Sequence, residues 1–408
     1  MPDPNACSVL FVDDEPLLLQ GLKRLLHGER EAWTMRFATS GQEALSLLER
    51  EAFDALVTDL RMPGMDGEQL LNAVKEHHPH MVRIVLSGEM NQASNIKAVR
   101  CAHRYLAKPC DAETLKSTLS QVFALRRWVD DHRLKELLAR LESLPSLPEA
   151  YAELLAEIQA PNSSFRKVGD LIARDVGMTA KILQIVNSAF FGLSRRILNP
   201  QDAVAMLGYD TLKALVLSTK VFSQFNAKRV RCLNLNALWQ HSMNTGLFAR
   251  SIGVGEKLPR TAQDEAFTAG ILHDVGKLIL AHNFPETYAE VITRSRAQQC
   301  PAAELEQWCF GASHAELGAY LLSLWGIGEE VVSAVVSHQC PQRITTPSRV
   351  LAVVYAANGL EHMLAGTAGN EAAAAVDPEI LKQLNVAERF GAWEKACRGI
   401  CSQEVERV

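Results

Sequence analysis

Short apolar runs alternate with stretches of helical periodicity over the first 124 residues of the chain. Apolar runs of this kind, bounded by polar turns, are typical of the buried strands of a parallel sheet. Five such strands are predicted, at Val9–Val12, Trp33–Ala38, Ala55–Thr58, Val82–Leu86 and Arg104–Ala107. Helices are predicted between them, at Glu15–His27, Gly41–Arg50, Gly67–His78 and Gln92–Cys101. The pattern therefore indicates an α/β unit whose five-stranded parallel sheet is covered by helices on both faces.

The rest of the chain shows only helical periodicity. Asp111 is a suitable N-cap for a helix that begins at Ala112, and a stripe of apolar residues then runs as far as Leu141. The stripe fits one long helix that carries motion or dimer contacts, and equally two helices with a joint near Arg126–His132. Trp393 indicates that the tail packs on the preceding helical domain. The predicted organisation is an α/β domain, a helical connector, an all-α domain and a helical extension, at 1–124, 125–143, 144–365 and 366–408.

Polar side chains follow four of the predicted strands at the point where each strand ends. Asp13 and Asp14 follow the first strand, and Asp59 follows the third. Ser87 and Lys108 follow the fourth and the fifth. Because the carboxyl ends of parallel strands meet at one edge of a sheet, these five side chains are expected to share a pocket. The three carboxylates form a candidate divalent-metal site, next to a hydroxyl and an ammonium that suit phosphoryl oxygens.

Together with the loop Met62–Gly67 and the pair Lys108-Pro109, these residues closely resemble the receiver domain of two-component response regulators. The resemblance implies a flavodoxin-like fold in which Asp59 accepts a phosphoryl group from a sensor histidine kinase. It also implies that Ser87 and Lys108 hold the phosphoryl oxygens and that Tyr105 moves with them. The implied ligands of a Mg²⁺ ion are Asp13, Asp14, Asp59 and the backbone carbonyl of Arg61.

Several strings in the second half, from Leu144 to about Leu364, resemble the HDOD domain, the HD-related output domain of bacterial signalling proteins. The strings are Leu144–Pro148, Asp175–Phe191, Ala203–Gly208, His273–Lys277 and His314–Ala319. The resemblance implies an all-α fold related to HD hydrolases, in which histidines and aspartates hold a metal that activates water. The candidate ligands are His241, His273, Asp274, His314 and His338, with Lys277 as a contact for phosphate.

The ligand set of an active hydrolase is incomplete in this sequence. Asn358 lies in the segment where the distal aspartate would fall, and Ser337 stands where the phosphodiesterase branch has a paired histidine. Three interpretations of the HD-type residues remain open: a metal-free relic, a mononuclear structural site for a transition metal, or a working phosphohydrolase. The first is preferred, because an amide is a weaker metal ligand than a carboxylate.

Composition narrows the classes of function further. Of the 408 residues, 48% are hydrophobic and 22% are charged, which is ordinary for a globular protein. A net charge of −5 and the lack of a basic recognition helix argue against nucleic acid binding. The nine scattered cysteines form no CxxC pair, and neither a signal-peptide pattern nor a membrane-spanning run is evident. These features favour a cytoplasmic protein with reduced thiols.

The combined expectation is a bacterial response regulator. Phosphorylation of Asp59 would switch a non-catalytic HDOD output that binds an unidentified signalling protein, and the connector could support a homodimer. The alternative is a receiver-gated, metal-dependent phosphohydrolase or phosphodiesterase of the HD type. A DNA-binding regulator is the third class, and the acidic charge disfavours it.

Overall fold

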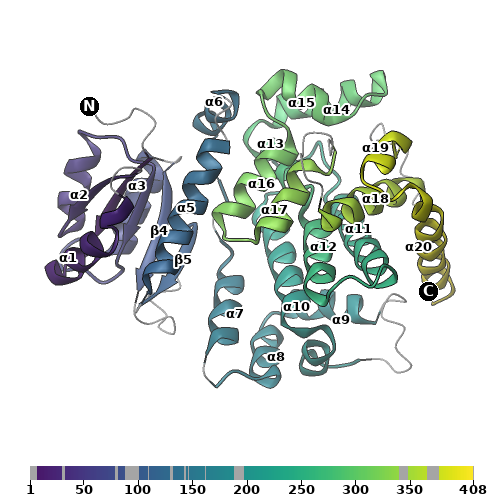
Figure 1. The fold of residues 1–408 in the computed structure, drawn as a ribbon, viewed down its shortest axis with the longest axis horizontal. Coiled ribbons are helices and arrows are strands. Elements are labelled where there is room, and N and C mark those ends of the chain that lie inside the picture. Colours follow the sequence, from purple (N-terminus) through teal and green to yellow (C-terminus); the bar gives the residue numbers. More distant parts are fainter. Residues whose placement is uncertain are drawn as a thin grey trace. The chain divides into compact units, whose positions relative to one another are not determined.

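The computed structural model describes residues 7–29, 33–78, 81–87, 101–108, 110–128, 132–141, 144–145, 147–160, 162–187, 197–339, 348–364 and 376–407. The chain divides into two compact units. One comprises residues 1–156 with 323–326, and the other comprises 157–322 with 327–408. The described strands belong to the first unit, and the described elements of the second are helices (Figure 1).

The first unit contains a parallel sheet with the strand order β2-β1-β3-β4-β5. Its strands are β1 (Cys7–Val12), β2 (Trp33–Ala38), β3 (Ala55–Thr58), β4 (Val82–Ser87) and β5 (Arg104–Ala107). All four pairings between neighbouring strands are parallel. Apolar side chains dominate both faces of the central strands, because helices rather than water cover a sheet of this type. The predicted α/β class is thereby confirmed.

The helices of the first unit lie between and after the strands along the chain. They are α1 (Pro16–Leu25), α2 (Gly41–Leu48), α3 (Gly67–His77) and α5 (Ala112–Trp128), followed by α6 (His132–Arg140) and α7 (Glu149–Gln159). A short 3₁₀ helix, η1 (His27–Glu29), follows α1. Leu10 and Leu56 of the sheet share a buried core with Leu48 of α2 and Leu70 of α3. The predicted helix at Gln92–Cys101 and the predicted joint at residues 129–131 lie outside the described residues, apart from Cys101.

The second unit is helical, as the periodicity predicts. Its helices are α8 (Phe165–Ala173), α9 (Val176–Val186), α10 (Pro200–Gln224), α11 (Leu235–Gly255), α12 (Arg260–Leu272), α13 (Val275–Asn283), α14 (Pro285–Gln298), α15 (Ala302–Phe310), α16 (His314–Leu324), α17 (Glu329–Ser337), α18 (Arg349–Leu364), α19 (Pro378–Gln383) and α20 (Ala387–Arg407). Helices α11, α12 and α18 pack against one another at its centre. None of the helices in the described ranges is both long and apolar enough to cross a bilayer.

Two pairs of glycines allow helices of this unit to approach closely. A Cβ atom on Gly270 of α12 would lie 2.6 Å from the Cα atom of Gly246 on α11. A Cβ atom on Gly276 of α13 would lie 1.9 Å from the carbonyl oxygen of His314, at the start of α16. Both distances are far below van der Waals contact, so only glycine fits at these positions. The crossings bring together the helix ends that carry the HD-type residues.

The C-terminal helix α20 packs on α11 and α18. Trp393 is 5% exposed, and its indole N–H donates to the carboxylate of Glu256 at 2.8 Å. Arg389 forms an ion pair with the same carboxylate. Trp393 and Arg389 of α20 thus both contact Glu256, the residue that follows α11.

Candidate functional site

The carboxylates Asp13 and Asp59 lie side by side at the carboxyl edge of the sheet. Val12 at the end of β1 pairs with Thr58 at the end of β3, so the next residue of each strand emerges at the same level. Asp13 is 3% exposed and Asp59 is 9% exposed. Two carboxylates that are this close and this buried repel each other unless a positive charge compensates them.

Lys108 supplies that positive charge. Its Nζ atom lies 2.7 Å from Oδ2 of Asp13 and 2.8 Å from Oδ1 of Asp59. Burial alone would lower the pKa of Lys108, but the hydrogen bonds and charges of the two aspartates outweigh it and raise the pKa above its ordinary value. The ammonium is therefore charged at neutral pH. At this edge of the sheet, one ammonium group therefore lies between two carboxylates.

The remaining oxygen atoms of the two aspartates are held by the backbone. The N–H of Glu15 donates to Oδ1 of Asp13 at 2.9 Å, and the N–H of Arg61 donates to Oδ2 of Asp59 at 2.8 Å. These bonds fix the orientation of both carboxylates. Asp14, the next residue along the chain, is half-buried.

The donor set at this edge suits a hard divalent cation. Asp13, Asp14 and Asp59 offer carboxylate oxygens, and Arg61 offers a backbone carbonyl close to Asp59, which are the ligand types that Mg²⁺ prefers. Ser87 ends β4 and Tyr105 lies within β5, but the side chains of both lie outside the described part of the structure. Their predicted roles with the phosphoryl group thus stay predictions.

The HD-type residues of the second unit meet in one buried cluster. His241 lies on α11, and His273 and Asp274 form the junction between α12 and α13. His314 begins α16, and His338 follows the last residue of α17. The exposed fraction is 9% for His241 and at most 1% for the other four side chains. The structure therefore brings together all five candidate ligands that the sequence indicates.

Each imidazole in this cluster is anchored through its Nδ1 atom. His241 contacts Glu361 Oε2 at 2.5 Å and His314 contacts Glu306 Oε2 at 2.7 Å. His273 contacts the carbonyl oxygen of Gly270 at 2.6 Å, and His338 contacts that of Val335 at 2.7 Å. Carboxylates and carbonyls only accept hydrogen bonds, so the proton of each ring lies on Nδ1. The four Nε2 atoms face inward, an arrangement typical of histidines that bind metals.

Asp274 lies at the centre of these four Nε2 atoms. Its Oδ2 atom is 3.5 Å from Nε2 of His273 and 3.7 Å from Nε2 of His241. Its Oδ1 atom is 3.2 Å from Nε2 of His314 and 3.8 Å from Nε2 of His338. Among the described residues, neither oxygen accepts a hydrogen bond of good geometry, and Nε2 of His338 has no hydrogen-bond partner. A buried carboxylate at the centre of four imidazoles, next to the unpartnered Nε2 atom of His338, has the ligand types of a cation site.

The metal-binding geometry resolves into two triads that share Asp274. One consists of His241, His273 and Asp274, and the other of Asp274, His314 and His338; within each, the potential ligand atoms lie within 4.8 Å of one another. Imidazole nitrogens with a carboxylate suit zinc and other first-row transition metals. The residues thus fit a metal centre by chemistry and by geometry.

The cluster also contains its own cations. Nζ of Lys277 lies 2.9 Å from Oδ2 of Asp274. Burial would lower the pKa of His314, but the charge of Glu306 and the contact with Asp274 raise it to about 9. Burial would raise the pKa of Asp274, and the surrounding positive charge holds it well below its usual range. Lys277 and protonated His314 therefore compensate Asp274 when no metal is bound.

His273 and His338 differ from His314 in their charge. Burial lowers the pKa of His273 to about 3, and burial lowers that of His338 well below its ordinary value. Both rings are therefore neutral at physiological pH. A neutral imidazole is the form that binds a metal.

The sequence pattern alone did not reveal the two anchoring carboxylates, Glu306 and Glu361. Glu306 is completely buried and also accepts hydrogen bonds from the hydroxyl of Tyr288 at 2.9 Å and the backbone N–H of His314 at 2.7 Å. Glu361 is 2% exposed and follows Asn358 by one helical turn on α18. Burial would raise the pKa of Glu361, but the bonds from His241 and Asn244 hold it below its ordinary value.

A third group of potential ligands adjoins the first triad. It consists of His241, Glu361 and His362. The rings of His241 and His362 lie 4.5 Å apart between centroids. The spacing of Asn358, Glu361 and His362 on one helix is a signal that could have pointed to this part of the cluster.

Comparison with protein families identifies both halves of the chain. Residues 9–120 match the response regulator receiver domain, and residues 144–341 match the HDOD domain. Among curated proteins, the response regulator protein FleR of Pseudomonas aeruginosa is 32% identical over 159 residues, covering 38% of this chain and 30% of its own length. An uncharacterised protein of Treponema pallidum is 27% identical over 207 residues, covering 49% of this chain and 38% of its own length. The chain thus spans well under half of these relatives.

Solved structures support the fold of the HDOD half. An HDOD domain protein of unknown function from Geobacter sulfurreducens aligns with a TM-score of 0.52 and 22% identity, covering 72% of this chain and 96% of that chain. A proposed phosphohydrolase from Shewanella amazonensis aligns with a TM-score of 0.52 and 23% identity, covering 66% of this chain and 96% of that chain. At this identity the likeness shows a shared fold only.

Proposed function

Because the chain is a response regulator that joins a receiver domain to an HDOD domain, we propose that phosphoryl transfer to Asp59 controls the HDOD output and that this output acts by binding a protein partner. The observation that carries the first part is the position of Lys108, whose ammonium bonds both Asp13 and Asp59. Adding a phosphoryl group to Asp59 would change the partners of this cation. A charge change at one strand edge is the type of event that switches such domains.

The geometry of Asp59 supports its role as the acceptor. A carboxylate oxygen of Asp59 attacks the phosphorus atom of a phosphohistidine on a sensor kinase, the P–O bond forms, and the P–N bond breaks with the electron pair leaving on the histidine nitrogen. The Arg61 N–H holds the other carboxylate oxygen at 2.8 Å and so orients the attacking atom. Lys108 offsets the charge that develops on the phosphoryl oxygens. A Mg²⁺ ion held by Asp13, Asp14 and Asp59 would supply further charge compensation.

The closed HD-type cluster supports a non-catalytic output. A hydrolytic metal centre needs a ligand position that substrate and water can reach. Asp274 is 1% exposed, and the buried ammonium of Lys277 lies beside its carboxylate. Without a metal, Lys277 and protonated His314 lie next to the carboxylate of Asp274 and offset its charge. These features favour a scaffold that sets the shape of a partner-binding surface.

A metal-dependent phosphohydrolase is the second candidate, and one observation favours it. The inward-facing Nε2 atoms of four anchored imidazoles surround a carboxylate that lacks hydrogen bonds of good geometry. His241, His273, Asp274, His314 and His338 would hold the metal, which would supply a Lewis acid and an activated water. Lys277 would then be placed beside the phosphate of a substrate.

Two measurements on the full chain test the proposal. The first identifies the phosphoacceptor, and the second separates the adaptor from the hydrolase. Intact-mass spectrometry after treatment with acetyl phosphate should show a single phosphoryl adduct that is lost in Asp59→Asn, and an unchanged adduct in this variant would place the acceptor elsewhere. Metal content and hydrolysis of bis-p-nitrophenyl phosphate should then be compared in wild type and Asp274→Asn. Turnover that is lost in the variant would establish the hydrolase, whereas no turnover in the phosphorylated, metal-loaded wild type supports the adaptor.

A further inference from the structure

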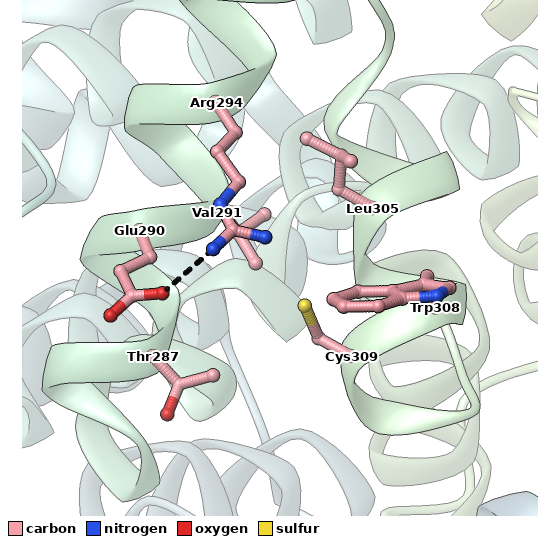
Figure 2. Close-up of a pocket in the computed structure, with 7 residues that line it drawn as sticks. All are labelled: Thr287, Glu290, Val291, Arg294, Leu305, Trp308 and Cys309. Atoms are coloured by element: carbon pink, nitrogen blue, oxygen red, sulfur yellow. Dashed lines mark hydrogen bonds and ion pairs between the residues drawn. The ribbon is translucent and has the colours of Figure 1, made fainter.

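A pocket separate from the HD-type cluster opens on the surface between α14 and α15. Its volume is about 380 Å³, within the range of about 300–1,000 Å³ typical of small-molecule sites. Thr287, Glu290, Val291 and Arg294 line it from α14, and Leu305, Trp308 and Cys309 line it from α15 (Figure 2).

The most unusual feature of this pocket is the exposed indole of Trp308. This side chain is 76% exposed, whereas Val291 in the same pocket is 1% exposed. A large aromatic side chain that is this exposed beside a pocket offers apolar contact area to a ligand. Figure 2 shows the indole on one side of the pocket, with Glu290 and Arg294 on the other side and the thiol of Cys309 between them. The ring therefore offers a platform on which a planar group can stack.

Arg294 provides a positive charge across the pocket from this platform. Within the described part of the chain it pairs with Glu290, at 3.4 Å, and the two side chains are 49% and 69% exposed. An exposed ion pair of this length contributes little to stability, so Arg294 can turn to a ligand at small cost. Guanidinium groups bind phosphate oxygens in a bidentate manner.

The other polar groups complete a set of complementary contacts. Thr287 offers a hydroxyl, and the carboxylate of Glu290 can accept from ribose hydroxyls or a base amino group. Burial raises the pKa of the Cys309 thiol, which therefore stays neutral and does not repel an anion. The set consists of an aromatic platform, an anion-binding guanidinium and two hydrogen-bonding groups around an apolar floor.

We propose that the pocket between α14 and α15 binds a purine nucleotide, with the base stacked on Trp308 and a phosphate paired with Arg294. The site is distinct from the HD-type cluster, although Tyr288 and Glu306 of the same two helices anchor His314. The proposal does not depend on whether that cluster binds a metal. It predicts a small-molecule input to the output domain, in addition to phosphorylation of the receiver domain.

The test is isothermal titration calorimetry of the full chain with guanosine monophosphate, guanosine and inorganic phosphate. Stacking on one aromatic side chain typically contributes enough that Trp308→Ala should weaken the nucleotide about 10-fold or more, while Trp308→Phe retains most of the affinity. Arg294→Gln should weaken guanosine monophosphate about 10-fold and leave guanosine unchanged. Arg296→Gln, an exposed arginine of the same helix that does not line the pocket, is the matched control.

Asp274→Asn separates this pocket from the HD-type cluster and should leave nucleotide affinity unchanged. Loss of binding in Asp274→Asn, with normal binding in Trp308→Ala, would assign the nucleotide to the HD-type cluster and overturn the proposal. Absence of binding at millimolar nucleotide would also overturn it. A protein partner whose binding depends on Trp308, in a chain that binds no nucleotide, would identify the pocket as a protein interface instead.

Discussion

The Nε2 atoms of His241 and His273 lie 3.1 Å apart. Both rings carry their protons on Nδ1, where Glu361 and the Gly270 carbonyl accept them. Two neutral rings in these tautomers would direct their lone pairs at each other, which is repulsive. A shared proton or a metal ion between the two nitrogens removes this repulsion. The contact therefore requires a proton or a metal ion between the two nitrogens.

Zinc should stabilise chelator-treated protein through this contact. At a free zinc concentration 100-fold above the dissociation constant, the free energy of unfolding is expected to rise by about 2.7 kcal/mol. Thermal unfolding with and without zinc measures the shift. His241→Gln and Asp274→Asn should each remove most of it, because each breaks the first triad. An equal shift in wild type and both variants would mean that zinc binds elsewhere.

Replacing Lys108 tests the charge cluster of the receiver domain. Lys108→Met leaves Asp13 and Asp59 adjacent, buried and without the ammonium that now lies within 2.8 Å of both. The cost is expected to be about 1–3 kcal/mol, less than for a fully buried pair because Lys108 keeps some exposure to water. Added Mg²⁺ should recover much of the loss, since a cation again separates the carboxylates. Thermal unfolding of wild type and variant, with and without Mg²⁺, provides the measurement; a loss that Mg²⁺ does not reduce would contradict this account.

Gly276→Ala tests the close approach of α13 to α16. The added Cβ atom would lie 1.9 Å from the His314 carbonyl oxygen, which is backbone and cannot rotate away. Separation of the two helices should destabilise the domain by several kcal/mol and displace His314 from Asp274. Gly391→Ala is the matched control, because nothing lies within 4 Å of its added Cβ on α20. There alanine should stabilise the helix by up to about 1 kcal/mol. Equal unfolding temperatures of the two variants would contradict the close approach of α13 to α16.

Because Cys397 is buried, the free energy of unfolding is expected to decrease at high pH. Its side chain is fully buried, and burial raises the pKa of the thiol to about 12 from 9.0. The thiol ionises at a lower pH in the unfolded chain than in the folded protein. Its contribution to stability is therefore fully present below pH 9 and is lost as the pH rises toward 12. By pH 10 the free energy of unfolding should fall about 1 kcal/mol more in wild type than in Cys397→Ala. Urea unfolding at pH 8 and 10 measures this; parallel behaviour of the two proteins would show that Cys397 does not contribute.

The receiver site could be predicted from sequence because its geometry is local to strand ends. Asp13, Asp59 and Lys108 each follow an apolar run, and a parallel sheet places such residues at one edge whatever the details of packing. The strand bounds Trp33–Ala38, Ala55–Thr58 and Arg104–Ala107 agree with the prediction for the same reason.

The HD-type cluster could be predicted only in part. Its histidines were indicated by motifs, but the carboxylates that orient them depend on how distant helices cross. Glu361 lies 120 positions from His241 in sequence, and no periodicity relates the two. The prediction placed emphasis on the missing carboxylate at Asn358, whereas a carboxylate is present one turn later on the same helix. The tautomer of His241, and therefore its chemistry, is determined by the tertiary contact of α11 with Glu361 on α18.

Glu306→Ala should be the most disruptive single change near the cluster. Glu306 is fully buried and accepts from the Nδ1 and backbone N–H of His314 and from the hydroxyl of Tyr288. Removing it leaves three buried donors without an acceptor, and the expected loss of unfolding free energy is about 3–5 kcal/mol.

Glu306→Gln distinguishes a positioning role from simple space filling. Glutamine keeps the shape and one carbonyl oxygen, so it should restore much of the stability. It cannot supply the carboxylate charge that holds His314, so the affinity for zinc should stay reduced about 10-fold or more. Glu304→Ala, an exposed carboxylate of the same helix, should change neither stability nor zinc affinity. If Glu306→Gln binds zinc as wild type does, the Glu306 carboxylate fills space without tuning the imidazole of His314.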